Sequence, residues 1–222
     1  IIDTRNNLFK SSDNAEIWKY VSNLGFNNKF QLEISGNIMY AGNNDNIYKS
    51  VDEGINWESI ERIEGSDTYR AFTIDKNSND IYVATSYALF RFNGENWNMI
   101  KTTGGDNSSQ CLAVDYDGYV YYGVYLFTIH KSTNKGVSWT SLDYSASSQG
   151  WSTTGAMYVT EDNILLMNRW WDGIYWLSGN DCLPLNNGFI DGSHVGTNNV
   201  VAKGENYFTT VRTLSGIIGV YK

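Results

Sequence analysis

Tryptophan, tyrosine, arginine and acidic residues gather in the irregular segments of this chain, where their side chains could bind a sugar or a peptide. The strongest such segment is Trp170-Trp171-Asp172-Gly173, and Trp151 stands in another that is rich in Ser, Gly and Thr. Aromatic rings stack on the C–H faces of sugars, while carboxylates and guanidinium groups form hydrogen bonds with hydroxyls. The candidate ligand-binding residues are Tyr69, Arg70, Trp151, Arg169, Trp170, Trp171, Asp172, His194 and Arg212.

Some of these residues have an equally good structural interpretation. Strand alternation would pack one of Trp170 and Trp171 between neighbouring sheets and leave the other at the surface. His194 is as consistent with a hydrogen-bonding loop residue as with a catalytic one.

Four aspartates in the irregular segments are the candidates for acid–base chemistry. Hydrolysis of a glycosidic bond by two carboxyl groups requires a separation of about 5–9.5 Å and a raised pKa for one of them. Nothing in the sequence pairs these residues, so we favour a chain without catalytic residues. They are Asp67, Asp106, Asp172 and Asp191.

The sequence contains no recognisable cofactor or metal site. The segment Asp75–Asp80 resembles the opening of a calcium loop, but it lacks the Gly and the distal Glu of an EF-hand and is interpreted as a turn. No Gly-rich phosphate loop, zinc-ligand spacing or Gly-X-Ser-X-Gly is present. We therefore expect no cofactor and no metal.

Composition narrows the classes of partner and of fold. The net charge of −8 argues against nucleic acid, which requires clustered Lys and Arg. No apolar run approaches the ~18 residues of a membrane span. The 222 residues suffice for one core, and 16 Tyr, 8 Trp and 21 Gly with a single Pro suit many short strands joined by turns.

The element that must position the candidate residues is a turn, Ser50-Val51-Asp52-Glu53-Gly54-Ile55-Asn56-Trp57. Alternating segments on both sides of it predict a β-hairpin. Gly54 can adopt a positive φ, Asp52 can accept N–H bonds within the turn, and Trp57 can fold back over the hairpin.

This turn recurs along the chain. Trp18, Trp57, Trp97 and Trp139 follow one another at steps of 39, 40 and 42 residues, and a fixed period of this size indicates a propeller or a related array. The residues expected to build the turns are Ser11, Asp13, Trp18, Ser50, Asp52, Gly54, Trp57, Gly94, Trp97, Ser132, Asn134, Gly136 and Trp139. Three copies depart from the pattern: Asn134 replaces the Asp, Ala15 replaces the Gly, and the Asn93–Trp97 turn is shortened.

The pattern Ser-X-Asp-X-Gly-X-X-Trp resembles the Asp box (BNR repeat) of sialidases, xyloglucan-degrading enzymes and sortilin-type receptors. The resemblance covers nearly the whole chain, and it implies that each turn joins the third and fourth strands of a propeller blade. It is specific for the blade and carries no activity with it.

Aligned on this repeat, the chain predicts an all-β fold of four-stranded antiparallel blades, whose strands we designate A to D. The predicted A strands are 30–35, 71–75, 111–115, 156–160 and 199–202, and the B strands 38–42, 81–85, 120–124, 164–168 and 207–211. The C strands are 8–10, 47–49, 89–92, 128–131, 174–177 and 218–221, and the D strands 17–21, 57–61, 97–101, 139–142 and 182–185.

We expect one propeller domain over residues 1–222, with repeats near 1–25, 26–65, 66–106, 107–150, 151–188 and 189–222. Five blades are favoured, with the strand around Trp18 completing the C-terminal blade, because closure removes open sheet edges. One C strand is then surplus, and six blades with one incomplete is the alternative. The chain begins at Ile1 without Met, which suggests a processed or excised piece.

The strand order separates two ends of the blades. The A–B and C–D turns share one end, the turn end, which carries all the Ser-to-Trp turns. The B–C and D–A loops share the other, the loop end, which carries the candidate ligand-binding residues. Loops on a rigid scaffold are where binding usually occurs.

Three functions remain open. The first is a non-catalytic recognition domain that binds a carbohydrate, as lectins do, or a protein through the loop end. The second is a glycoside hydrolase of the sialidase or xyloglucanase type. The third is a structural or assembly module of a larger secreted protein. We expect a glycan or protein partner, no nucleic acid, no membrane insertion and an extracellular or cell-surface location, and we make no prediction of oligomeric state.

The hydrolase alternative has partial support in the residues. The resemblance to sialidases implies three arginines that clamp a substrate carboxylate, and Arg70, Arg169 and Arg212 could converge at the loop end. The early Arg-Ile-Pro motif of sialidases is absent, because Arg62-Ile63 is followed by Glu64.

Overall fold

The computed structural model is all-β, and the residues it describes form strands and no helix. It describes residues 1–26, 31–66, 68–103, 111–123, 128–143, 154–169, 173–178, 181–185, 196–203, 206–212 and 218–221. At residues 143, 154, 155, 169 and 178, and from 196 onward, it describes the backbone alone.

The first ten strands are β1 (Asn7–Lys10), β2 (Lys19–Asn23), β3 (Gln31–Ser35), β4 (Ile38–Gly42), β5 (Ile47–Ser50), β6 (Glu58–Ser59), β7 (Tyr69–Ile74), β8 (Ile81–Thr85), β9 (Ala88–Phe92) and β10 (Trp97–Thr102). The remaining strands are β11 (Cys111–Val114), β12 (Val120–Gly123), β13 (Thr128–Ser132), β14 (Thr140–Asp143), β15 (Thr154–Val159), β16 (Leu165–Arg169), β17 (Gly173–Ser178), β18 (Asp181–Pro184), β19 (Gly196–Lys203), β20 (Asn206–Arg212) and β21 (Ile218–Tyr221).

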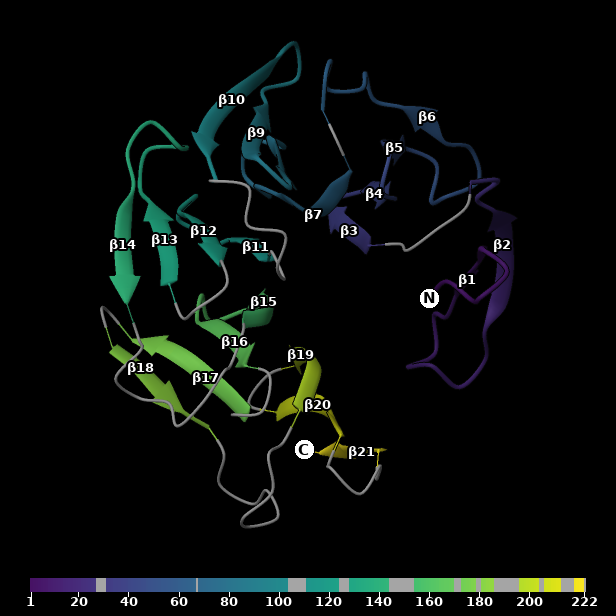
Figure 1. Cartoon of the computed structure of the whole chain (residues 1–222). Coiled ribbons are helices and arrows are strands. Elements are labelled where there is room, and N and C mark those ends of the chain that lie inside the picture. Colours follow the sequence, from purple (N-terminus) through teal and green to yellow (C-terminus); the bar gives the residue numbers. More distant parts are fainter. Residues whose placement is uncertain are drawn as a thin grey trace.

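The strands form blades around a common centre (Figure 1). Four sheets have four antiparallel strands each, β3–β6, β7–β10, β11–β14 and β15–β18, and a fifth, β19–β21, has three. Strands β1 and β2 form a separate two-stranded sheet. In every sheet the neighbours in space are the neighbours in sequence, so each blade is a simple meander.

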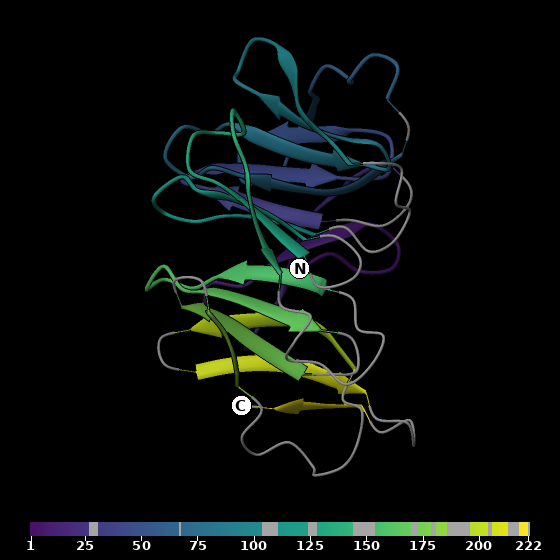
Figure 2. The same ribbon diagram turned by 60° about the vertical axis from the view of Figure 1, so that its left-hand side comes forward.

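The first strand of each large sheet lies at the centre. Strands β3, β7, β11, β15 and β19 follow one another there, each in contact with the next. In Figure 2 the successive sheets lie one above another, and their turns gather at two opposite ends of the strands. Every residue of β8 is buried, whereas both residues of β6 are exposed. Burial therefore falls from the centre outward, as expected where only the inner strands are covered on both faces.

The hydrophobic core lies between the sheets. Tyr40 and Ile47 of one sheet cluster with Phe72, Ile74 and Val83 of the next. Equivalent clusters join β8 and β9 to β11 and β12, and β12 and β13 to β16. The apolar face of each sheet packs against the next sheet along the chain. Each core cluster is therefore built by two neighbouring sheets.

The predicted strands are confirmed, but the predicted number of blades and the predicted closure by the N-terminal strand are wrong. All of the predicted strands overlap strands of the structure, including the weak one at 182–185. Five blades, or six, is wrong: the described residues form four complete blades. The strand near Trp18 does not complete the C-terminal blade, because β2 pairs with β1, from Asn7↔Asn23 to Lys10↔Lys19. A hairpin closed by an eight-residue turn costs little chain entropy, which favours this local pairing.

Within the described ranges, no helix is long and apolar enough to span a membrane.

Candidate functional site

The turn end is built from side chains that bond to the backbone of their own turn. Ser50 Oγ accepts hydrogen bonds from the N–H of Gly54 (2.9 Å) and donates to Asp52 Oδ1 (2.8 Å). Asp52 in turn accepts from the backbone N–H of Asn56 (2.9 Å) and from its side-chain amide (2.7 Å). These bonds from Asn56, followed by the one from Ser50, lower the pKa of Asp52.

Two more turns repeat this arrangement. Ser132 Oγ accepts from Gly136 N (2.8 Å), and Asn134 Oδ1 accepts from Ser138 N (2.8 Å), so the amide of Asn134 replaces the carboxylate. In the first turn, Ser11 Oγ accepts from Ala15 N (3.0 Å). Ala15 has a φ of 70° where the other two turns have Gly54 and Gly136, at 86° and 91°. A positive φ strains alanine and not glycine, so the first turn is strained at a position where the other two turns are not.

The indoles of the later turns bind carbonyls. Trp57 Nε1 donates to the carbonyl of Gly54 (3.0 Å), within its own turn. Trp139 Nε1 donates to Gly136 (3.1 Å) and also to Ile100 of the preceding sheet (3.4 Å). Trp97 Nε1 donates across the boundary, to the carbonyl of Glu61 (2.6 Å), which follows the last strand of the preceding sheet.

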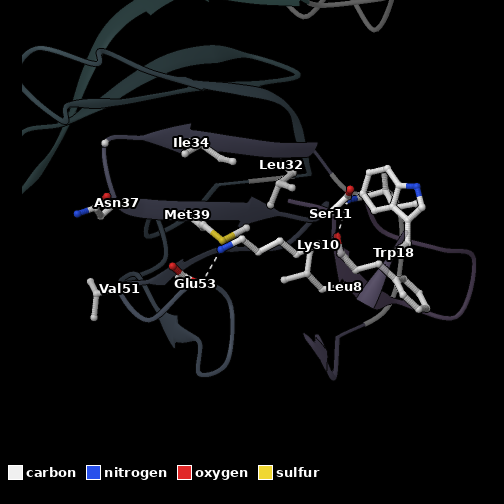
Figure 3. A pocket seen from close by; sticks show the side chains of 13 residues that line it. Leu8, Lys10, Ser11, Trp18, Leu32, Ile34, Asn37, Met39, Val51 and Glu53 are labelled. Carbon is white, nitrogen blue, oxygen red and sulfur yellow. Dashed lines mark hydrogen bonds and ion pairs between the residues drawn. The ribbon is translucent and has the colours of Figure 1, made fainter. Parts of the chain in front are cut away.

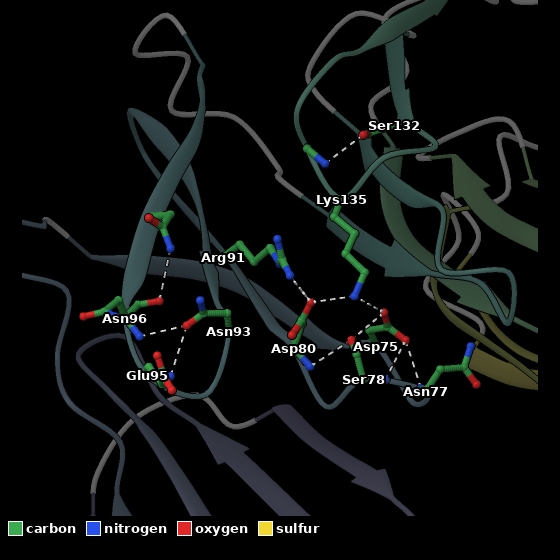
Figure 4. Close-up of polar contacts among 12 residues, drawn as sticks. Asp75, Asn77, Ser78, Asp80, Arg91, Asn93, Glu95, Asn96, Ser132 and Lys135 are labelled. Atoms are coloured by element: carbon green, nitrogen blue, oxygen red, sulfur yellow. Dashed lines mark hydrogen bonds and ion pairs between the residues drawn. The ribbon is translucent and has the colours of Figure 1, made fainter.

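The segment Asp75–Asp80, also at the turn end, holds an ion network between two sheets (Figure 4). Asp80 lies 2.6 Å from Arg91 Nη2 and 3.0 Å from Lys135 Nζ, which also lies 3.8 Å from Asp75. Burial acts to raise the pKa of Asp80, but the bonds from Lys135 and Arg91 outweigh it and hold the pKa below its usual range. The carboxylates are thus occupied by protein cations, and no metal-binding cluster occurs in the described part of the chain.

The loop end presents a different kind of group, centred on Arg70 at the start of β7. Its Nε and Nη2 both donate to Ser86 Oγ, each at 3.2 Å, while the side chain stays exposed. Ser86 is 2% exposed and precedes Tyr87, which is 61% exposed. A guanidinium bonded to Ser86 and the exposed ring of Tyr87 are thus both found at the loop end, at the turn between β8 and β9.

Neighbouring residues fix this turn. Thr103 N donates to the carbonyl of Tyr87 (2.7 Å), and Thr103 Oγ1 donates to the carbonyl of Ser86 (3.2 Å). Thr85 Oγ1 accepts from the N–H of Ala88 (3.2 Å). The group is therefore preorganised, which reduces the ordering cost of binding.

Tyr69 has a structural role, and Tyr87 was missed by the sequence analysis. Tyr69 is 5% exposed, and its hydroxyl accepts a hydrogen bond from Ile63 N (3.0 Å). Its ring therefore cannot stack on a ligand. The available signal for Tyr87 was an aromatic residue in the short turn between the predicted strands 81–85 and 89–92.

The other predicted site residues are largely outside the described part of the chain. For Arg169 and Arg212 only the backbone is described: they end β16 and β20, opposite Thr154 and Gly196. Arg70 stands beside Tyr69, which pairs with Thr85 at the end of β8. The three arginines thus occupy the loop end of three different sheets. Outside the described residues lie Trp151, Trp170, Trp171, Asp172 and His194, and the aspartates 67, 106 and 191.

Comparison with known proteins supports the fold. No protein-family model matches the sequence, and no curated protein sequence does. A solved structure of YCF48 bound to a D1 peptide is similar over 99% of this chain and 72% of that one, with a TM-score of 0.63 and 15% identity.

Two further similar structures are longer proteins. The extracellular domain of a putative one-component system from B. thetaiotaomicron matches with a TM-score of 0.67 and 14% identity, over 97% of this chain and 30% of that one. A GH74 enzyme from Niastella koreensis matches with a TM-score of 0.59 and 20% identity, over 84% and 28%. At these identities the similarity shows the β-propeller fold and nothing further.

Proposed function

We propose that the chain is an Asp-box β-propeller domain over residues 1–222 that acts as a non-catalytic recognition domain and binds its ligand at the loop end. The contrast between the two ends carries this proposal. At the turn end, Ser50, Asp52 and their equivalents form their hydrogen bonds within their own turns. At the loop end, Arg70 and Tyr87 are held in place and remain exposed.

An extended protein segment with a carboxylate is the ligand that this group supports best. Of the five N–H donors of a guanidinium, Arg70 uses two on Ser86, so about three remain for a ligand. A carboxylate matches this fork, and Tyr87 can pack against a neighbouring apolar side chain. The bound peptide of the similar YCF48 structure is consistent with a peptide-binding propeller.

A glycan is the second candidate ligand. The aromatic residues expected at the loop end, Trp151, Trp170 and Trp171, are of the type that stacks on sugars, and Tyr87 adds another exposed ring. His194, Arg169, Asp172 and Arg212 would then bind hydroxyl or carboxylate groups of the sugar. Tyr69, which is buried, would anchor the start of β7 next to Arg70 through its bond to Ile63.

A glycoside hydrolase remains the alternative, since a GH74 enzyme has a similar fold. Its general acid needs a raised pKa. Among the described carboxyl groups, burial raises the pKa of Glu33 in β3, whereas hydrogen bonds lower the pKa values of Asp13, Asp52 and Asp80. Any hydrolase would depend on aspartates 67, 106, 172 and 191, and release of reducing sugar from xyloglucan or a sialoside would establish it.

Location and assembly follow from the same proposal. A recognition domain of this kind fits an extracellular or cell-surface setting, as a module of a larger secreted protein. Similar propellers include an extracellular domain.

The test is binding to a peptide array and a glycan array, with the wild type and two variants. Arg70→Ala and Tyr87→Ala should each weaken binding of the selected ligand by about tenfold or more, because Arg and Tyr are enriched among the interface residues whose truncation costs about 2 kcal/mol or more. Tyr116→Ala, which removes a tyrosine 39% exposed at the turn end, is the matched control and should bind normally. Equal loss in the Tyr116 variant, or none in the other two, would refute loop-end binding.

A further inference from the structure

The turn between β4 and β5, at the loop end, is fixed by its own side chains. Asn43 Oδ1 accepts hydrogen bonds from the N–H groups of Asp45 (2.8 Å) and Asn46 (2.7 Å). Asn43 N donates to the carbonyl of Asn46 (3.0 Å), and Asn46 Nδ2 donates to Ser59 Oγ of β6 (2.5 Å). The backbone at Asp45 is therefore held in place, while its carboxylate is exposed.

This turn is bonded to the start of β7, where Arg70 lies. Tyr69 N donates to the carbonyl of Asn44 (2.7 Å). Asp45 and Arg70 each directly follow one of these two bonded residues, so their Cα atoms are at most about 14 Å apart. Asp45 belongs to the β3–β6 sheet and Arg70 to the β7–β10 sheet. The loop end thus carries opposite charges at the boundary between these two sheets.

Neither charge is neutralised by the described part of the chain. Its ion pairs do not include Asp45 or Arg70. Its hydrogen bonds do not reach the Asp45 carboxylate, and Arg70 donates only to Ser86. Exposure does not prevent pairing elsewhere, since the exposed side chains of Lys10 and Glu53 form an ion pair of 2.6 Å (Figure 3). The charges of Asp45 and Arg70 are therefore both available to a ligand.

The same local turn recurs at the turn end, between β9 and β10 (Figure 4). Asn93 Oδ1 accepts from the N–H groups of Glu95 (3.1 Å) and Asn96 (2.9 Å), as Asn43 does from Asp45 and the residue after it. Glu95 is also exposed. The chain thus holds two acidic residues in matching turns, one beside the start of β7 and one at the opposite end of the blades.

We infer that Asp45 determines specificity at the loop end: it binds a basic side chain of an extended partner segment whose carboxylate binds Arg70. This inference rests on the proposed function. A carboxylate and an ammonium or guanidinium group form charge-assisted hydrogen bonds. Because an extended chain advances about 3.3–3.6 Å per residue, the acidic and basic residues of the partner lie within about four positions of each other.

The pair of charges also selects between the candidate ligands. A segment with acidic residues at both positions is repelled by Asp45, and like charges across an interface suppress a wrong partner. A neutral or acidic glycan supplies no cation for Asp45. The arrangement therefore favours a protein segment of mixed charge over a glycan.

The test uses fluorescein-labelled peptides of Ser and Thr that carry a Leu beside one Glu, and a Lys one to four positions from that Glu. Anisotropy titration of the whole protein should show the tightest binding at one spacing. At that spacing, replacing the Lys of the peptide by Gln should weaken binding about threefold, as for an exposed ion pair, and replacing it by Glu at least about tenfold.

Variants of the protein assign this preference to one residue. Asp45→Asn should bind the Lys and Gln peptides equally, and Asp45→Lys should prefer the Glu peptide. Both variants are expected to fold, because the turn is held by the backbone N–H of Asp45 and not by its carboxylate. Glu95→Gln is the matched control and should keep the preference of the wild type.

The outcomes separate this inference from the proposed function. If the wild type does not distinguish Lys from Gln, or if Asp45→Asn keeps the preference, the inference fails, and loop-end binding stands as long as Arg70→Ala weakens it. If none of the peptides binds, the inference also fails. Binding to a glycan array that Arg70→Ala weakens would then leave only the proposed function in place.

Discussion

Serine side chains have different structural roles at the two ends of the blades. At the turn end, Ser50 bonds to Asp52 and Gly54, two and four residues away. At the loop end, the hydroxyl of Ser86 accepts a hydrogen bond from Arg70, sixteen residues away. The carbonyl of Ser86 accepts one from Thr103, seventeen residues away. A serine therefore stabilises a single turn in one place and positions an exposed cation in the other. Substitutions at the turn end should therefore lower the stability of the fold, whereas substitutions at the loop end should lower the affinity for the ligand.

Gly136→Ala should give the largest effect on the turn-end side. The residue has a φ of 91°, and an added Cβ would lie 2.6 Å from Ile100 Cδ1 and 2.8 Å from its Cβ. Strain and overlap together should reduce the free energy of unfolding by about 3 kcal/mol, measured by urea denaturation.

Gly94→Ala is the matched control, since Gly94 has a φ of 97° and nothing within 4 Å of an added Cβ. It should lose only about 1 kcal/mol, the cost of the backbone conformation alone. Equal losses would show that the Ile100 contact does not matter.

Arg91→Met should have the next largest effect. It leaves Asp80, which is 4% exposed, with Lys135 as its remaining ion-pair partner. We expect a loss of about 2 kcal/mol at pH 7, below the full cost of a broken buried pair because Lys135 stays. Lys10→Met removes an exposed pair and should cost no more than about 0.5 kcal/mol.

The pH dependence sharpens this prediction. The pKa of Asp80 is lower in the folded state than its ordinary value, so its contribution to stability is complete above the unfolded pKa and is lost as the pH falls through the folded one. Arg91→Met should make the stability decline at a higher pH than in the wild type. An unchanged acid limb in urea titrations between about pH 6 and 2.5 would contradict this assignment.

Ser50→Ala and Ser86→Ala test the comparison directly. Ser50→Ala removes an acceptor of turn N–H groups, much like the loss of a helix cap, and should cost about 1–2 kcal/mol in urea denaturation. Ser86→Ala should cost only about 0.5 kcal/mol, because exposed Arg70 can bind water instead.

Binding should rank the two variants in the opposite order. Ser86→Ala releases the guanidinium of Arg70 and should weaken the loop-end ligand, whereas Ser50→Ala should leave its affinity unchanged. If Ser86→Ala were the less stable variant, or had no effect on binding, the division of roles between the two ends would be wrong.

Local spacing explains how much of the molecule could be predicted from sequence. The turn at Ser50–Trp57 could be predicted because its hydrogen bonds join residues at most four positions apart. The same spacing at Ser132 locates the strands on either side of that turn. The closure of the blades could not be predicted, because β2 has the same local residue pattern whether it pairs with β1 or with the C-terminal sheet. The partnership of Arg70 with Ser86 was missed for the same reason, since it depends on the register of β7 against β8.

The indole bonds of Trp97 and Trp139 to carbonyls of the preceding sheet have a consequence for how the molecule melts. A sheet that opens withdraws a hydrogen-bond partner from the tryptophan of its successor, as well as apolar cover. The three blades that these bonds join, β3–β6, β7–β10 and β11–β14, should therefore lose protection against hydrogen exchange together and denature as one cooperative unit rather than one after another.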